Sequence, residues 1–411
     1  MTTEHSTDAS GSEDLTFADI VWIQFKKNRV ALVSAWGLAG LFFIAITAPL
    51  FASGRPFVWD AGEGTSYPWF SSLFDRNYFE NPVDIFFNLL LILGLPLLVG
   101  WFVRVKMIQS KGLEKRHRRR LMRNEAVVAI GVVLVVFVGL LVQPHSEPYV
   151  QYTDIVEARA EKGETTSAIF PPVPFMFRNT GFRSLDRPSA QHWLGVDEST
   201  RDVGTRLLYG TRISLTIGVI AVAIYVTIGI FLGALAGFYA GKIDMLIQRV
   251  IEIVMSIPAL IIILVLVAFL EKPSIFHIML VIGLVRWTGV ARLVRGEFYR
   301  LRSLDFVTSA IALGFPTRKV IFQHILPNAM GPVLVAATFG VAGAILLEST
   351  LSFLGLGDLS APSWGQTLQE GYSSGAWHLI LAPGFAIFIT VSLLNLVGEG
   401  LRDALDPKMR R

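Results

Sequence analysis

The fold of this chain is decided by a polar interruption between two long apolar runs, Asp305-Phe-Val-Thr-Ser-Ala-Ile-Ala-Leu-Gly-Phe-Pro-Thr-Arg-Lys-Val-Ile-Phe-Gln-His-Ile-Leu-Pro-Asn328. Its first half favours helix up to Gly314, a residue type that readily adopts the positive φ found where a helix ends. Pro316 fits the first turn of a second helix, whose residues 320–325 supply an apolar face. Pro327 marks the entry into the next apolar run. The pattern predicts two short helices separated at a glycine, with small side chains that let another protein's backbone approach closely.

The regions around this stretch are apolar in runs long enough to cross about 30 Å of hydrocarbon, which takes about 20 helical residues. Lipid offers no hydrogen-bond partner to the backbone, so runs of this length are expected to be helices, and no series of alternating ten-residue strands is visible. The sequence therefore predicts an all-α, polytopic membrane protein with about eight transmembrane helices, at 30–52, 85–103, 126–143, 213–240, 250–270, 274–294, 329–354 and 378–401.

The composition excludes several other classes of protein. The 411 residues are 53% hydrophobic and only 17% charged, whereas a soluble domain has about 25% charged residues. The absence of cysteine excludes disulfide scaffolds, thiolate metal sites and cysteine nucleophiles. The seven histidines are scattered without metal-ligand spacing, so no metal site is expected. A net charge of +4, carried beside apolar runs, does not indicate a nucleic-acid partner.

The distribution of basic residues predicts how the helices are oriented. Placing the N-terminus inside the cell puts 24 of the 36 Lys and Arg residues on the cytoplasmic face, as positively charged loops prefer. Both termini are therefore expected in the cytoplasm. The densest basic run, at 111–123, is interpreted as an anchor on anionic lipid headgroups, with docking of an acidic partner as the alternative.

The stretch 305–328 resembles the coupling loop of ATP-binding-cassette (ABC) importer permeases, whose pattern is Glu-Ala-Ala, a glycine three or four residues later, and then Ile-Leu-Pro. Thr308, Ser309 and Ala310 occupy the Glu-Ala-Ala positions, and Gly314 is the glycine. The candidate ATPase-coupling residues are therefore Thr308, Ser309, Ala310, Gly314, Ile325, Leu326 and Pro327. Thr308 departs from the usual Glu and Ile311 from the common Arg, so the loop lacks charges that would help hold it in an ATPase groove.

Further motifs place the resemblance within the second, C-type permease subunit of the oligopeptide, dipeptide and nickel group. They cover roughly 192 to the C-terminus and comprise His192-Trp-Leu-Gly-Val-Asp197, Arg201-Asp202, Tyr209-Gly-Thr-Arg-Ile-Ser214, Ala291-Arg-Leu-Val-Arg-Gly296, Glu348-Ser-Thr-Leu-Ser-Phe-Leu-Gly-Leu-Gly357, Pro362-Ser-Trp-Gly365 and Leu401-Arg-Asp-Ala-Leu-Asp-Pro407. Nickel, sugars and antibiotic peptides are other substrates of this group. The expectation of a peptide substrate therefore rests only on the closeness of these motifs to those of peptide systems.

The resemblance also implies a domain organisation. Family members usually have six spans, one leading helix and a type I importer core of five, so the two spans at 85–143 are interpreted as an inserted pair. We expect a cytoplasmic polar tail and amphipathic entry at 1–29, the leading helix plus inserted pair with a basic cytoplasmic loop at 30–143, a Pro-rich, irregular extracytoplasmic segment at 144–206, the permease core at 207–401 including the coupling loop 305–328, and a cytoplasmic tail at 402–411.

The resemblance implies a partner for each task that the chain does not perform itself. No phosphate-cradling G-x-x-x-x-G-K-[ST] motif is present, so the chain is expected to be no enzyme and to hold no cofactor. One or two separate ABC ATPase subunits would bind ATP-Mg. A second permease would complete the pathway as a heterodimer, an extracytoplasmic solute-binding protein would deliver substrate, and membrane lipid would surround an assembly in the bacterial plasma (inner) membrane.

Two charged residues within spans are candidates for the translocation pathway. A charge in the bilayer is costly, so Arg286 and Glu348 are functional hypotheses, set against structural ion pairs as the alternative. A secondary transporter remains the main rival function, although prolines at 96, 258 and 383 interrupt spans without the internal symmetry expected of that class. An uncoupled membrane scaffold is a further alternative because of Thr308. No catalytic motif supports an intramembrane enzyme.

Overall fold

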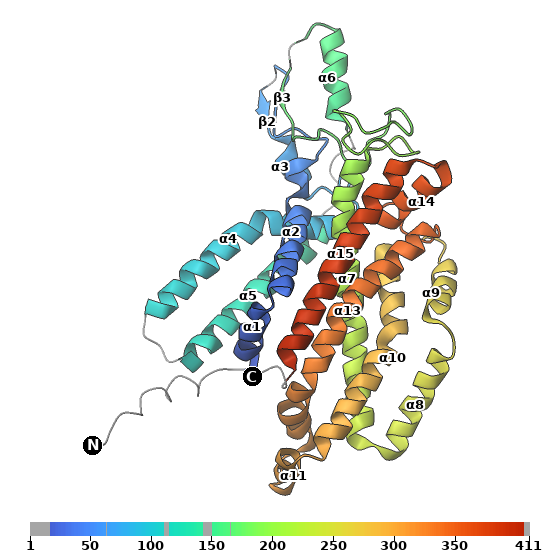
Figure 1. Cartoon of the computed structure of the whole chain (residues 1–411). Helices are drawn as coiled ribbons and strands as arrows, with labels where there is room; N and C mark the ends of the chain where they lie inside the picture. Colours follow the sequence, from blue (N-terminus) through green and yellow to red (C-terminus); the bar gives the residue numbers. More distant parts are fainter. Residues whose placement is uncertain (1–16, 63, 111–114, 143–149, 165, 407–411) are drawn as a thin grey trace, which may run out of the picture. The chain divides into compact units, whose positions relative to one another are not determined.

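The computed structural model describes residues 17–62, 64–110, 115–142, 150–164 and 166–406 (Figure 1). Most of these residues are helical. In chain order the elements are α1 (Phe17–Lys27), α2 (Arg29–Phe51), β1 (Val58–Asp60), β2 (Thr65–Ser66), α3 (Pro68–Ser72), α4 (Pro82–Ser110), α5 (Lys115–Val142), α6 (Tyr152–Glu161), β3 (Ser167–Ile169), α7 (Val203–Tyr239), α8 (Gly241–Met255), α9 (Ala259–Ala268), α10 (Ile275–Arg302), α11 (Asp305–Ala312), α12 (Thr317–Lys319), the π-helix η1 (Val320–Ile325), α13 (Leu326–Phe353), α14 (Trp364–Ser374) and α15 (Trp377–Leu405).

The helices confirm the predicted polytopic fold. Among the described residues, six helices are long and apolar enough to cross a bilayer, and two bent pairs bring the number of candidate spans to eight. The first pair, within α4, bends by 43° near Pro96, and the second, α8 with α9, bends by 75°. The predicted span at 250–270 is therefore not one straight helix, because Pro258 cannot donate the backbone hydrogen bond that would continue α8.

The described residues form two compact units, each considered by itself. The first comprises residues 17–40, 217–348 and 387–406, and the second comprises 41–216 and 349–386. The basic loop predicted at 111–123 lies partly outside the described residues, as do the tails at 1–29 and 402–411 and the first part of 144–206.

The first unit is held together by close helix packing. Gly229, Gly233 and Gly237 recur every fourth residue on α7, and at each of them a Cβ would collide with α10. Small residues at this spacing allow two helix backbones to approach closely in a membrane. A second link joins α8 to α10, where Arg295 Nη2 lies 2.7 Å from Asp244 Oδ2 and the Tyr299 hydroxyl donates to the same oxygen. These contacts fix α7, α8 and α10 as one group.

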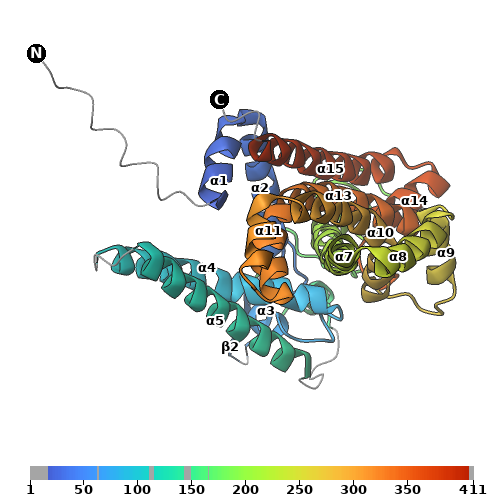
Figure 2. The same ribbon diagram turned by 90° about the horizontal axis from the view of Figure 1, so that it is seen from below.

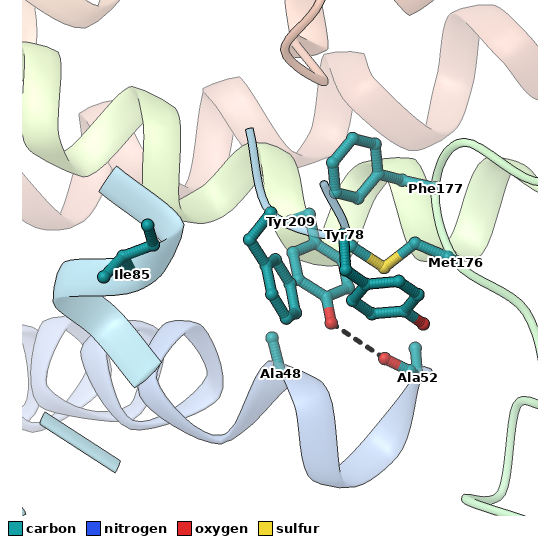
Figure 3. Packing of buried hydrophobic residues seen from close by; sticks show 8 residues of the cluster. Ala48, Ala52, Tyr78, Ile85, Met176, Phe177 and Tyr209 are labelled. Carbon is teal, nitrogen blue, oxygen red and sulfur yellow. Dashed lines mark hydrogen bonds between the residues drawn. The ribbon is translucent and has the colours of Figure 1, made fainter. Parts of the chain in front are cut away.

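The second unit has an aromatic core under its loops (Figure 3). The Tyr209 hydroxyl donates to the carbonyl of Ala52 at 2.9 Å, which fastens the start of α7 to the end of α2. Tyr78 is fully buried beside them, and burial raises the pKa of its hydroxyl because the phenolate would be poorly solvated. The remaining members of this core are Ala48, Phe79, Ile85, Met176 and Phe177.

The helical hairpin of α4 and α5 belongs to the second unit. Its two helices run side by side in both views (Figures 1 and 2), with an ion pair of 3.0 Å between Arg104 and Glu125. Its base is tied to α7 by Arg212, which has no solvent exposure, contacts Asp84 Oδ1 at 3.0 Å and donates to the carbonyl of Ala45 at 2.7 Å. A buried charge needs such partners, so the hairpin is anchored to the helices beside it.

The segment expected to be irregular, 144–206, contains regular structure in its described part. It includes α6 and strand β3, which pairs antiparallel with β1 in a three-stranded sheet of order β2-β1-β3. Helix α7 also begins ten residues before the predicted span start at 213, at Val203. Asp202 caps this first turn by accepting a hydrogen bond of 2.7 Å from the Thr205 backbone amide. The prediction of an irregular segment up to 206 was therefore wrong at these elements.

Candidate functional site

The stretch 305–328, here called the elbow, has the two-helix form predicted from its sequence. Helix α11 ends at Ala312, and Gly314, two residues later, has a φ of +77°, a conformation that other residues rarely adopt. The Gly314 amide donates to the carbonyl of Ile311 at 2.9 Å, and the Phe315 amide donates to that of Ala310 at 3.1 Å. These two bonds form a Schellman motif, which satisfies carbonyl groups that a helix end leaves free. Gly314 is therefore required by the backbone geometry of the elbow.

The second half of the elbow is a continuous helix with one widened turn. Pro316 precedes α12, and η1 then leads into α13. The Leu326 amide donates to the carbonyl of Ile321, five residues earlier, instead of four. Pro327 explains this geometry, because it has no N–H to donate and its ring would clash with the carbonyl four residues before it. The Asn328 side chain donates to the carbonyl of His324 at 2.7 Å.

The outer surface of the elbow is exposed over a continuous run. All residues from 311 to 319 are exposed, including Leu313 at 75% and Ile311 at 50%. The basic residues Arg318 and Lys319 lie on the same run, and the Lys319 amine sits 4.0 Å from the centroid of the Phe315 ring. Exposed apolar surface flanked by charge is typical of a protein interaction site.

The candidate coupling residues divide between this exposed surface and the interior. Ala310 and Ile325 are buried, whereas Thr308, Ser309, Gly314 and Pro327 are exposed and Leu326 is intermediate. The Thr308 hydroxyl donates back to the carbonyl of Asp305 at 3.1 Å. The Thr308 hydroxyl is therefore hydrogen-bonded within its own helix, and Thr308 places no charge on the surface.

A second candidate site is a cavity of about 470 Å³ in the first unit. It lies at the break between α8 and α9, where Met255, Ile257 and Pro258 line it. The other walls come from α7, α10 and α13. Helix breaks and polar groups at mid-membrane depth are typical of substrate pathways in transporters.

One of the two predicted pathway residues, Arg286, lines this cavity. Arg286 lines it near the middle of α10, together with Thr288 on the same helix and Tyr225 from α7. Arg286 is the one ionisable cation in this lining, and no carboxylate accompanies it there. The arrangement can bind an anionic group within an otherwise mainly apolar wall.

The other predicted pathway residue is not in this lining. Glu348 is 2% exposed and lies near the end of α13, and it interacts with neighbours in the described chain. Its burial agrees with the structural alternative for this residue. The structure thus places Arg286 and Glu348 in different surroundings instead of in one site.

A cluster of four charged residues in the second unit, three of them buried and one partly exposed, was not recognised from sequence. This charge cluster consists of Asp197, Arg201, Arg206 and Glu370: Arg201 contacts Asp197 at 2.8 Å and Glu370 at 2.9 Å, and Arg206 contacts Asp197 at 3.4 Å. Burial raises the pKa of Glu370, and Arg206 opposes this effect. The spacing of Asp197 and Arg201 was a visible signal, but Glu370 is 169 residues away from Arg201.

Comparison with known proteins identifies the family. Residues 229–411 match the family described as binding-protein-dependent transport system inner membrane component, and residues 16–66 match the N-terminal transmembrane domain of oligopeptide transport permease C. The chain is 37% identical over 310 residues to the oligopeptide transport system permease protein OppC of Haemophilus influenzae, covering 74% of this chain and 91% of OppC. The chain belongs to this family of ABC importer permeases.

One further relative and one solved structure also match. The permease is 38% identical over 229 residues to the dipeptide transport system permease protein DppC of Bacillus subtilis, covering 54% of this chain and 71% of DppC. A solved structure of the MetNI methionine ABC transporter aligns with 49% of this chain at 17% identity and a TM-score of 0.42. The predicted family is confirmed, and the permease is an integral inner-membrane protein with transport relatives.

Proposed function

We propose that this permease is one of two membrane subunits of an ATP-driven importer for peptides. The relatives described above are named as oligopeptide and dipeptide transport permeases, which supports a peptide substrate. A second, different permease would complete the pathway, one or two ABC ATPases would bind ATP-Mg, and a solute-binding protein would deliver the peptide from outside. Both termini lie in the cytoplasm in this proposal, in agreement with the distribution of basic residues.

The observation that carries the proposal is the exposed elbow. Its apolar residues Ile311 and Leu313 have no cover within the described chain, and the Schellman turn at Gly314 fixes how they are presented. An ATPase groove is a partner that would cover them. Closure of two ATPases on ATP would then move the elbow and the start of α13 together, because η1 joins them without a break.

The cavity at Arg286 is this subunit's contribution to the pathway in the proposal. A peptide carries a terminal carboxylate, and Arg286 offers a guanidinium that suits a carboxylate. Movement of α13 relative to α8 and α9 would change the access to the cavity, because all three helices line it. The domain boundaries predicted above, with a core at 207–401 and an inserted pair at 85–143, are part of this proposal.

The test is recovery of the assembled transporter. The tagged chain is purified from its native membrane in mild detergent, the bound proteins are identified by mass spectrometry, and ATP hydrolysis is measured on the eluate. We expect a second permease, one or two ATPases and hydrolysis that rises when solute-binding protein and peptide are added. A chain that is repeatedly recovered alone and without hydrolysis would contradict the proposal and favour a secondary transporter.

One observation favours a second candidate, an uncoupled membrane scaffold. Thr308 replaces the usual Glu, and its hydroxyl is bonded to the elbow's own backbone. In that case ATPases could be absent or bound without stimulation by substrate. The same purification separates the two candidates, because a scaffold would retain partners without hydrolysis that responds to peptide.

A further inference from the structure

Helix α7 carries a second feature, a groove on a face that does not pack against α10. The groove has a volume of about 630 Å³ and is lined on α7 by Thr227, Ile230, Phe231, Ala234, Leu235 and Tyr239. From Thr227 to Tyr239 the helix rises about 18 Å at 1.5 Å per residue. The groove therefore follows α7 over a length suited to an extended chain.

The opposite wall of the groove comes from the second half of the elbow. Ile321, Phe322 and Leu326 supply apolar side chains, and Thr317 and Arg318 lie at the end where the elbow begins. Most of the lining is apolar, and Phe231 is 63% exposed although it lies within a long hydrophobic helix. The described chain thus leaves an apolar channel open along α7.

A basic hollow adjoins this groove. It has a volume of about 420 Å³, is lined by Pro316, Lys319 and Gln323, and shares Arg318 and Phe322 with the groove. Neither lining contains an acidic residue. Arg318 and Lys319 are exposed, so their charges are available to a ligand that lies along the groove.

We infer that the groove and the hollow together bind one anionic phospholipid of the leaflet facing the elbow. An acyl chain would lie along α7 and the phosphate would contact Arg318 and Lys319. Basic pockets at helix ends suit anionic headgroups. Tyr239, an exposed residue at the end of α7, is of the aromatic type that is enriched at membrane interfaces. The inference rests on the proposed orientation of the permease, and it requires no ATPase.

The site links the lipid to the coupling mechanism. Arg318 lies on the exposed run of the elbow and also lines the groove, so a bound phosphate would hold α12 against the end of α7. The bound lipid would thus stabilise one position of the elbow. A change in headgroup charge would then alter ATP-coupled transport without contact between lipid and peptide.

Lipid binding by the purified full chain tests the inference. The chain is delipidated in detergent and titrated with phosphatidylglycerol or with phosphatidylcholine of the same acyl chains, and retained lipid is counted by native mass spectrometry. We expect one tightly retained phosphatidylglycerol and no comparable phosphatidylcholine. Arg318→Ala should weaken retention about fivefold, equivalent to about 1 kcal/mol for one basic residue near the headgroups.

Two further variants separate the groove from general charge and hydrophobicity. Ala234→Trp places a large side chain in the groove lining on α7 and should abolish retention. Val219→Trp, on an exposed part of α7 outside the lining, and Arg300→Ala, which removes an exposed cation paired with Glu297, should retain lipid as the wild type does.

The opposite results would overturn the inference. Equal retention of both lipids, or of phosphatidylglycerol by Ala234→Trp, would mean that the groove selects no anionic lipid. Loss of retained lipid when the second permease assembles, with weaker assembly in Ala234→Trp, would mean that a subunit interface occupies the groove. Because retention is measured on the chain alone, a failure of ATPase recovery would leave this result unaffected.

Discussion

The elbow and the charge cluster differ in how their side chains meet solvent. In the charge cluster Asp197 has no solvent exposure and its carboxylate is shared by two arginines. In the elbow the run 311–319 leaves apolar and basic side chains in contact with solvent. Buried charges need partners, whereas a continuous exposed apolar surface is typical of an interaction site. The cluster thus pairs its charges within the second unit, whereas the elbow of the first unit leaves a surface that a partner would cover in the proposal above.

The largest expected effect is loss of stability when the charge cluster is broken. Asp197→Ala removes a carboxylate that pairs with both Arg201 and Arg206. Removal of one partner of a buried ion pair lowers the free energy of unfolding by about 3–5 kcal/mol. The thermal midpoint of the purified permease should fall, as measured by fluorescence-detected size-exclusion chromatography after heating. Glu198→Ala is the matched control, because Glu198 is exposed and next in sequence. Equal midpoints for the two variants would show that the cluster is not a structural frame.

The next effect is loss of transport by a permease that is still present in the membrane. Gly314→Asp forces a residue with a Cβ into φ +77°, at a cost of about 1–2 kcal/mol, and adds a negative charge to the docking surface. Peptide uptake by membrane vesicles should fall about tenfold or more, while the amount of permease in the membrane is unchanged. Gly296→Asp introduces the same side chain at an exposed helical glycine whose Cβ would meet no neighbour. Comparable uptake by both variants would contradict a special role for the elbow.

The elbow was the region that the sequence predicted best, and the reason is local. Gly314, Pro316 and Pro327 each restrict the backbone on their own, so the turn and the two helix starts could be predicted from single residues. The widened turn of η1 was not predicted, although Pro327 is its cause, because a proline near a helix start is also compatible with a regular helix.

The charge cluster and the small sheet depend on contacts between distant parts of the chain. Strand β1 at residues 58–60 pairs with β3 at 167–169, and Arg201 pairs with Glu370 across 169 positions. No local pattern specifies such partners. For the same reason the sequence indicated Arg286 and Glu348 as charges within spans but did not reveal that one lines the cavity and the other is buried.

A smaller effect concerns the residue at which the elbow departs from its family. Thr308→Glu would restore a carboxylate on the exposed face of α11, where Thr308 now bonds its own backbone. An exposed charge pair contributes about 0.2–1 kcal/mol, so ATP hydrolysis stimulated by peptide should rise about twofold. Thr308→Gln matches the size without the charge and should behave as the wild type does. A decrease with Glu would mean that the partner groove is adapted to a neutral residue here.

The smallest expected effect is a pH dependence of stability in the charge cluster. Burial raises the pKa of Glu370 above its usual 4.5, so the folded protein binds this proton more tightly than the unfolded chain. The stabilising contribution of protonation is therefore complete below pH 4.5 and is lost as the pH rises through the raised pKa. Glu370→Gln removes the titration, so its thermal midpoint should vary less with pH than that of the wild type. One titrating group changes the free energy of unfolding by at most about 1.4 kcal/mol per pH unit. Glu198→Gln, at an exposed site, should leave the pH profile unchanged. Identical profiles for the wild type and Glu370→Gln would mean that Arg201 and Arg206 keep Glu370 ionised throughout, so that pairing within the cluster outweighs burial.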